Sequence, residues 1–180
     1  MRRQTRRRGL RSRIPTSVAR PQVTIREATP EDHAIILHHR RSMFRDMGDG
    51  TLPELDRTAE LTGPWLKQSL ADGSYRGWLA ADHAGRVIAG GGVLLSSWPA
   101  SPNDPLLRRA MILNVYTEPE FRQRGLARLV LETILDWLRQ QGFHSVSLHA
   151  SDAGRPIYEK LGFRPTNEMR LRFDVGEQKP

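Results

Sequence analysis

The sequence predicts an α/β protein built on a mixed, mostly antiparallel sheet of six to seven strands flanked by helices. Two segments of alternating apolar residues are joined by the short polar turn 82–86, which indicates a β-hairpin. A nearly continuous apolar run at 111–116 indicates a strand covered on both faces. A helix of clear 3.6-residue period then separates this run from another alternating segment, as in a strand–helix–strand unit.

The first elements are a short strand and a long helix. Residues 23–26 alternate and predict the strand. Residues 29–32, Thr-Pro-Glu-Asp, predict a helix start, with threonine as N-cap and proline at the first helical position. The helix should run over 30–47, because a glycine follows it. Residues 49–63 show no clear pattern, and a Gly-Pro pair predicts a second, short helix over 64–70.

The middle of the chain is predicted to be mostly strand. Residues 75–81 and 87–97 form the two arms of the hairpin, and residues 111–117 form the next strand. The run Gly90-Gly91-Gly92 interrupts the second arm. Glycine inside a strand pattern favours a β-bulge or a close approach of another backbone, so we expect one of these there.

The best-defined helix follows, over residues 125–141. Its apolar positions recur at i, i+3, i+4, i+7 and i+8, which places them on one helix face. Beyond it we expect a strand over 144–150, a short helix that ends at Leu161, and a last strand over 169–173.

The charge of the chain is concentrated at its N-terminus. Eight of the 28 basic residues lie in residues 1–20, which contain no acid, so the remaining 20 basic side chains match the 20 acids. We therefore expect a basic arm over 1–21, a single domain over 22–175 and a tail over 176–180. The arm could contact nucleic-acid phosphates nonspecifically, but a dispensable tail is the favoured interpretation.

Composition excludes several classes of protein. The chain has no cysteine, which excludes disulfides, a thiolate nucleophile and cysteine-based zinc sites. It has no apolar run long enough for a membrane helix, and we expect a cytoplasmic protein. His38 and His39 are adjacent on a predicted helix and point about 100° apart, so we expect a solvated face there and no metal.

The turn between strand 111–117 and helix 125–141 carries the chemistry. A chain that passes from a strand into a helix leaves the first helical amides unpaired, and these amides form an anion site with the helix dipole. Gly125 and Ala127 are small enough for a close approach of the ligand, and three arginines, at positions 122, 124 and 128, add charge. An Arg-x-x-Gly-x-Ala string also arises easily by chance in an arginine-rich chain, so this motif alone is weak.

Two blocks together resemble a known family. The first runs from Asn114 to Ala127 (NVYTEPEFRQRGLA) and is similar to a Gln/Arg-x-x-Gly-x-Gly/Ala signature with its leading strand. The second runs from Pro156 to Phe163 (PIYEKLGF) and is similar to a Tyr-Glu-x-Leu-Gly-Phe block. Both are typical of the GNAT superfamily of N-acetyltransferases, which use acetyl-coenzyme A, and the resemblance covers about residues 22–175.

The resemblance implies a GNAT-like fold and a set of donor-binding residues. The backbone of one strand would pair with the pantetheine arm of acetyl-coenzyme A, and this strand would splay away from strand 144–150. Tyr158 would protonate the departing thiolate, although packing on a short helix is its plainer role. The pantetheine contacts would be Val115, Tyr116 and Thr117, and the pyrophosphate contacts would be the amides of Gln123, Arg124, Gly125, Leu126, Ala127 and Arg128.

The implied activity is transfer of an acetyl group from acetyl-coenzyme A to a primary amine of a small molecule or peptide, with no metal. A non-catalytic acyl-coenzyme A sensor of the same fold is the alternative. The general base stays open among Glu118, Glu27, Glu168 and His149. The acceptor amine and a homodimer stay open too. Candidate acceptor-site segments are helix 30–47 with Met43, Phe44 and Met47, segment 49–63, and loop 99–108 with Trp98.

Overall fold

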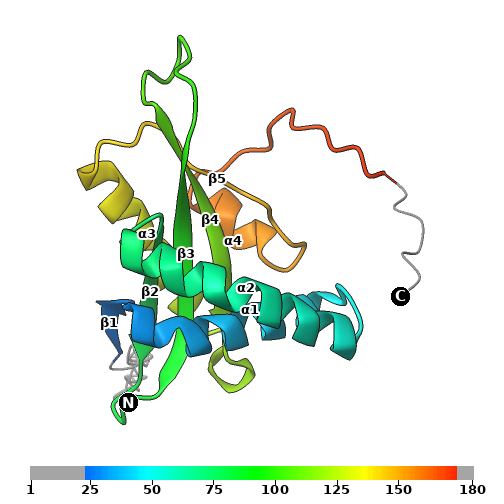
Figure 1. Cartoon of the computed structure of the whole chain (residues 1–180). Helices are drawn as coiled ribbons and strands as arrows, with labels where there is room; N and C mark the ends of the chain where they lie inside the picture. The colour runs from blue at the N-terminus through cyan, green and yellow to red at the C-terminus, as the bar shows by residue number, and fades with distance from the viewer. Residues whose placement is uncertain (1–22, 174–180) are drawn as a thin grey trace, which may run out of the picture.

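The computed structural model describes residues 23–173 of the 180-residue chain, so the predicted arm and tail lie outside the described residues. Two single-turn 3₁₀ helices, Pro30–Asp32 and Pro119–Phe121, join the main elements. The main elements are β1 Thr24–Glu27, α1 His33–Met47, α2 Leu52–Asp72, β2 Tyr75–Ala81, β3 Val87–Ser97, β4 Arg108–Thr117, α3 Leu126–Gln140, β5 Ser147–Leu148 and α4 Arg155–Lys160 (Figure 1).

The sheet has five strands in the order β1-β2-β3-β4-β5, all antiparallel to their neighbours except the parallel pair β4 and β5. The prediction of a mixed, mostly antiparallel sheet is confirmed, but six to seven strands is wrong. Segment 164–173 leaves the body of the protein instead of forming a last strand (Figure 1). Its alternating side chains Met169, Leu171 and Phe173 are 76–95% exposed. Alternation marks an apolar face but supplies no strand edge to pair with.

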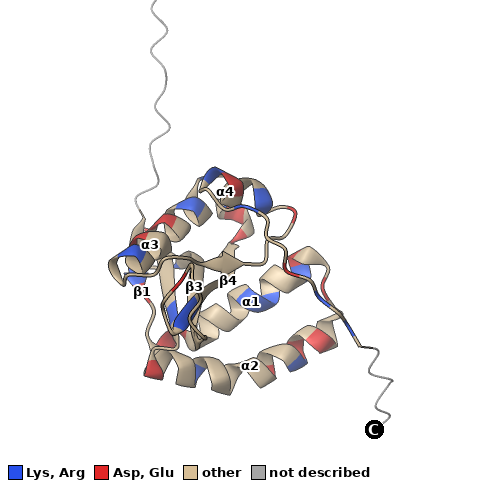
Figure 2. Ribbon diagram, turned by 90° about the horizontal axis from the view of Figure 1, so that it is seen from above, with Lys and Arg blue, Asp and Glu red and all other residues tan. Residues whose placement is uncertain are grey.

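The sheet lies between two helical layers. Helices α1 and α2 cover one face, and α3 and α4 cover the other (Figure 2). The core on the α3 side contains Val93, Val130 and Ile134, and the core on the α1 and α2 side contains Leu66 and Tyr75. The amphipathic pattern of the helix predicted at 125–141 is confirmed, because α3 buries Leu126, Val130, Leu131, Ile134, Leu135 and Leu138.

Helix α2 corrects the prediction of a patternless segment followed by a short helix. A capping box begins it: the Thr51 backbone amide donates to Glu54 Oε2 at 2.7 Å, and the Thr51 hydroxyl donates to the same oxygen at 2.8 Å. The helix then continues through Pro64, which lacks an amide hydrogen. One buried face, formed by Leu55, Leu66 and Ser69, stabilises the whole length, so tertiary packing overrides the local break.

A β-bulge interrupts the pairing of β3 with β4. Gly90 is opposite Tyr116 and Gly92 is opposite Leu113, so β4 carries one extra residue across from Gly91. The extra residue follows from Asn114, whose φ of 56° lies in the left-handed region. The bulge expected at the glycine run is confirmed, and the inserted residue belongs to the facing strand.

In the described part of the chain, no helix has the length and apolar character that crossing a membrane requires.

Candidate active site

The sheet opens at β4. Strand β4 pairs with β5 at only two positions, Met111 with Ser147 and Ile112 with Leu148. Beyond these positions β4 continues to Thr117 while still paired to β3 on its other side, so one edge of residues 113–117 has no strand partner among the described residues. An unpaired strand edge exposes amide and carbonyl groups that an extended ligand can bind. The predicted separation of this strand from the 144–150 segment is therefore present.

Side chains from α1 and β2 hold the bulge in β4. Asn114 tolerates a positive φ because its short polar side chain can make local hydrogen bonds. Its Nδ2 donates to Tyr75 Oη at 3.1 Å, and its Oδ1 accepts from Arg40 Nη1 at 2.8 Å. Gly92 makes room for Tyr75, because a Cβ at this position would overlap the phenol oxygen. Burial raises the pKa of Tyr75 to about 12, so its hydroxyl stays protonated.

The turn after β4 brings the unpaired amides of α3 to the same end of the strand. Residues Gln123 and Gly125 have φ values of 60° and 80°, and Gly125 is the N-cap. The first helical hydrogen bond runs from the Leu129 amide to the Gly125 carbonyl oxygen at 3.0 Å. The amides of residues 126–128 therefore have no carbonyl of the helix to bind. A Cβ on Gly125 would meet no atom within 4 Å, which leaves open space at the helix end.

The arginines of this turn are less free than their sequence suggests. Arg122 pairs with Asp46 at the end of α1, and its Nε donates to the Thr117 carbonyl oxygen at 3.0 Å. Arg128 pairs with Glu132 one turn along α3 at 2.8 Å. Arg124 donates to a backbone carbonyl at 2.9 Å and has no acidic partner within 4.0 Å in the described part of the chain. Backbone amides and Arg124 thus supply most of the local positive potential.

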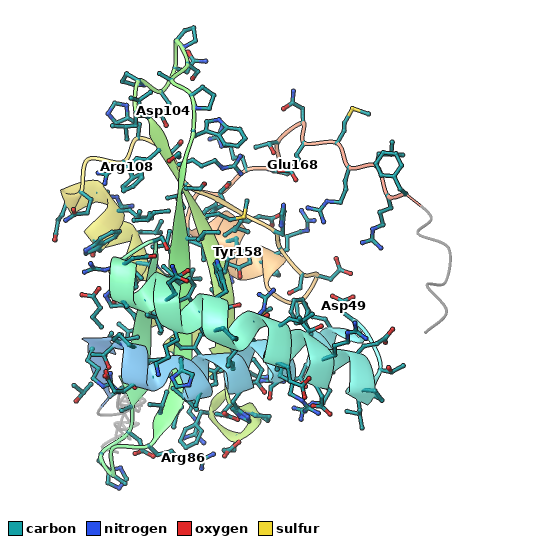
Figure 3. The ribbon with its side chains drawn as sticks, in the orientation of Figure 1. Asp49, Arg86, Asp104, Arg108, Tyr158 and Glu168 are labelled. Carbon is teal, nitrogen blue, oxygen red and sulfur yellow. The ribbon has the colours of Figure 1, made fainter. Side chains whose placement is uncertain are left out.

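Tyr158 lies on α4, on the other side of the separation between β4 and β5. Its ring packs against the α3-side core and makes an edge contact with Phe163, with 5.9 Å between ring centroids. Figure 3 shows it between β4 and α4. Its hydroxyl makes no hydrogen bond within residues 23–173, and burial raises its pKa above the ordinary value. A partly buried, protonated phenol without a partner is a group that could give a proton to a ligand.

A second titratable cluster lies where α1 crosses the end of β4. His38 Nε2 is 3.0 Å from Glu118 Oε1, and His39 Nε2 is 3.6 Å from the same oxygen. His39 is buried against the Tyr116 ring, so the expectation of a solvated face holds for His38 alone. Burial and the neighbouring His38 lower the pKa of His39 to about 4. Over residues 23–173 no three His, Asp or Glu side chains are grouped as metal ligands.

The four candidates for a general base lie at different places in the structure. Glu118 adjoins the free edge of β4, and its side chain is only 13% exposed, which contrasts with a solvated turn residue. His149, which directly follows β5, contacts Glu168 of the exposed segment 164–173 at 3.1 Å, and Glu27 pairs with Arg76.

The candidate acceptor segments are also separated. Asp104 and Arg108 lie at the opposite end of the sheet from Arg86 (Figure 3), which bonds to Glu120 in the turn at 2.6 Å. The loop 99–108 is therefore far from the turn, whereas the end of α1 contacts the turn through Asp46 and Arg122.

A hollow of about 340 Å³ opens elsewhere, between the C-terminal ends of α3 and α4. Its lining includes Leu138, Phe143, Val146 and Phe163. Because it lies at the other end of α3 from Gly125, it adds nothing to the anion site.

Sequence reasoning missed the residues that surround the bulge. Arg40 and Tyr75 carry no local signal, because Asn114, their partner, is 74 and 39 positions away in the chain. Asn114 does carry one: it is a polar residue inside the apolar run 111–116, where a strand covered on both faces should have none.

Comparison with solved structures finds proteins of similar fold. A GCN5-related N-acetyltransferase structure from Ralstonia eutropha JMP134 has a TM-score of 0.79 at 32% identity, covering 84% of this chain and 98% of that one. A predicted acetyltransferase from Clostridium acetobutylicum, solved with acetyl-CoA, has a TM-score of 0.76 at 26% identity, covering 84% and 96%.

Two curated relatives share a shorter stretch. Glucosamine 6-phosphate N-acetyltransferase of Trypanosoma brucei brucei is 34% identical over 64 residues, which are 36% of this chain and 43% of that protein. The ribosomal protein bS18-alanine N-acetyltransferase of Salmonella typhimurium is 37% identical over 70 residues, which are 37% and 45%. The chain thus spans less than half the length of these two relatives.

The family model described as Acetyltransferase (GNAT) family matches residues 37–163, which is more than half of the chain and includes both sequence blocks. The chain therefore belongs to the GNAT family of acetyltransferases.

Proposed function

We propose that this protein transfers the acetyl group of acetyl-CoA to a primary amine of a small molecule or peptide, by direct attack in a ternary complex. The observation that carries the proposal is the free edge of residues 113–117, which the turn 118–125 connects to the unpaired amides at the start of α3. The strand edge is suited to binding an extended pantetheine arm through its amide groups, and the helix amides are suited to binding a pyrophosphate. Two relatives named above act on an amino sugar phosphate and on an alanine, and both acceptors are amines.

The donor would lie along β4 with its thioester at the bulge. The backbone of Val115, Tyr116 and Thr117 would bind the pantetheine, and the amides of residues 123–128 would bind the pyrophosphate. Thr117 Oγ1 is buried without a hydrogen-bond partner in the described chain, so the donor would also satisfy this hydroxyl.

The chemistry follows from this placement. The lone pair of a neutral amine attacks the thioester carbonyl carbon, and an amide of the β4 edge stabilises the oxyanion that forms. The C–S bond then breaks, and the Tyr158 hydroxyl gives its proton to the departing thiolate. The surplus proton of the acylated nitrogen passes through water and restores the phenol. Holding amine and thioester together supplies much of the rate.

Thermal unfolding with acetyl-CoA tests donor binding. At a hundredfold excess over Kd, we expect about 2.7 kcal/mol of added stability. Gly125→Asp places a carboxylate at the anion site without a clash, because its Cβ meets nothing within 4 Å, and should abolish this stabilisation. Gly142→Asp is the matched control at the other end of α3, with a φ of 74° and equally open space, and should retain it.

Release of free coenzyme A thiol across a panel of amines then tests transfer. Stabilisation by acetyl-CoA followed by amine-dependent thiol release supports an enzyme. Stabilisation without release would support the acyl-CoA sensor. The absence of both stabilisation and thiol release would exclude the enzyme and the sensor alike. A cytoplasmic location, a homodimer and any role of the basic arm stay predictions.

A further inference from the structure

Helix α1 carries three arginines, and the one that is least exposed has no acidic partner. Arg41 pairs with Asp56 at 2.6 Å, and Arg45 pairs with Asp46 at 3.1 Å. Arg40 points under the helix toward β4 and makes no ion pair with any residue in 23–173. A partly buried charge requires a counter-charge more than an exposed one does, so the lack of one at Arg40 is unusual.

The hydrogen bonds of the Arg40 guanidinium are incomplete. Nη1 donates to Asn114 Oδ1 at 2.8 Å, and the group lies 4.7 Å from the Phe44 ring centroid. Nε is buried and has no hydrogen-bond partner among residues 23–173. Burial lowers the pKa of Arg40 below its ordinary value, and no nearby carboxylate offsets this effect. Arginine still stays protonated, so a positive charge with spare donors remains beside the bulge.

The position of this charge indicates what it would bind. Asn114 lies in β4 two residues past Ile112, the last residue paired with β5, where the proposed thioester would lie. Arg40 contacts Asn114 from the α1 side of the sheet, whereas Tyr158 packs against the core on the α3 side. A group that binds Arg40 would therefore belong to the acceptor and not to the donor.

We propose that Arg40 recognises an anionic group, a carboxylate or a phosphate, on the acceptor amine. This inference rests on the proposed function and adds a substrate class to it. Arg40 Nη2 makes no hydrogen bond to any residue in 23–173 and, unlike Nε, is not buried. A planar guanidinium can bind either oxyanion at two points through its terminal nitrogens. A hydrogen bond to a charged group in a partly buried site corresponds to about a 10- to 100-fold preference for the anionic acceptor.

Matched pairs of amines test the proposal and distinguish the two anions. Glucosamine is compared with glucosamine 6-phosphate, and alaninamide with alanine, by the kcat/KM for coenzyme A release. We expect the anionic member of one pair to be preferred about 10- to 100-fold, mainly through a lower KM. The pair that shows the preference identifies phosphate or carboxylate.

Variants on α1 attribute the preference to one residue. Arg40→Gln should remove the preference, and Arg41→Gln, which removes a paired arginine from the same helix, should leave it in place. Arg40→Lys keeps the charge but loses the planar fork, so it should retain part of the preference and serves if Arg40→Gln does not fold.

The outcomes separate the two proposals. Turnover of amines without any preference for the anionic members, or a preference that survives in Arg40→Gln, overturns the role of Arg40 and leaves the acetyltransferase standing. If acetyl-CoA does not stabilise the protein and no amine is turned over, the proposed function itself is overturned, and the role of Arg40 with it. If only Arg40→Lys folds, an undiminished preference in that variant overturns the role of the guanidinium fork.

Discussion

The two faces of the sheet beside the β4–β5 separation are built in different ways. On the α3 face, which our proposal makes the donor side, the groups are mainly backbone amides and carbonyls of the β4 edge and of the α3 N-terminus. On the α1 face, which our proposal makes the acceptor side, they are side chains that meet across long stretches of sequence: Arg40 contacts Asn114, Asn114 contacts Tyr75, and His39 lies beside Glu118. A site made of backbone needs only a strand, a turn and small residues in order, and such an order forms a readable motif.

The difference also has an energetic side. Backbone groups at a strand edge or helix end are solvated when no ligand is present, so leaving them unpaired costs little. The acceptor-side network is buried and polar, so each member depends on its partners for hydrogen bonds. We therefore expect single substitutions to act on the donor side through catalysis and binding, and on the acceptor side through stability as well.

The largest effect that we expect is on kcat, and it comes from Tyr158, a side chain on the donor side. It tests whether the donor side works through backbone groups alone. Tyr158→Phe removes a hydroxyl without a hydrogen-bond partner in residues 23–173 and keeps the ring that packs on Phe163. If Tyr158 is the general acid, kcat falls about 10²- to 10⁴-fold. Steady-state kinetics measures the fall, and stabilisation by acetyl-CoA should be unchanged. An unaltered kcat would show that the donor side works through its backbone alone.

The next largest effect is a loss of stability when a side chain is added beside the acceptor-side network. Gly92→Ala would place a Cβ against Tyr75 Oη and 2.7 Å from the Arg76 carbonyl oxygen, and backbone cannot easily move away. Overpacking of this kind costs about 3 kcal/mol. Denaturant unfolding should show the loss, and the acceptor KM should rise because Tyr75 supports Asn114.

Gly63→Ala is the matched control for this substitution. Gly63 lies inside α2, and its nearest neighbour would be Leu37 Cδ1 at 3.5 Å, an ordinary contact. Alanine in a helix interior is favoured over glycine by about 0.5–1 kcal/mol, but the ring of Pro64 disfavours a Cβ on the helical residue before it, so we expect little net change in stability. Equal stability for both variants would mean that the space around Gly92 is not needed.

The same division explains how much the sequence predicts. Strands 75–81 and 87–97, the helix over 125–141 and the bulge at the glycines all have local periodic signals, and all are present. Helix α2 was also readable, since Thr51-Leu52-Pro53-Glu54 is a capping box, but the Gly-Pro pair within the helix obscured it. Only long-range packing could show that Pro64 does not end the helix.

The errors near the C-terminus have another cause. The 144–150 pattern yields only the two-residue β5, and 169–173 forms no strand at all. A strand needs a partner edge as well as an alternating sequence, and the partner is a property of the fold. The Arg40–Asn114 contact joins residues 74 positions apart, so no reading of one sequence predicts it.

The smallest effect that we expect is a pH dependence of the unfolding free energy, which comes from His39 on the acceptor side. The pKa of His39 is about 4 in the folded protein, below the ordinary value of 6.5. A lowered pKa means that the unfolded chain binds the proton more readily than the native one does. The stability linked to His39 is therefore fully present above pH 6.5 and is lost as the pH falls toward 4. Between pH 7.5 and 5 the loss is about 2 kcal/mol.

Neighbouring histidines provide the control. His39→Gln should flatten the pH dependence of the unfolding free energy between pH 7.5 and 5, whereas His38→Gln, with its half-exposed ring, should follow the parent. Protonated His39 would gain some stabilisation from the Glu118 carboxylate 3.6 Å away, so a parent that keeps its stability down to pH 5 would mean that this attraction outweighs burial. Hydrogen exchange locates the loss: because His39 lies between α1 and Tyr116, amides of α1 should exchange faster at pH 5, before those of α3.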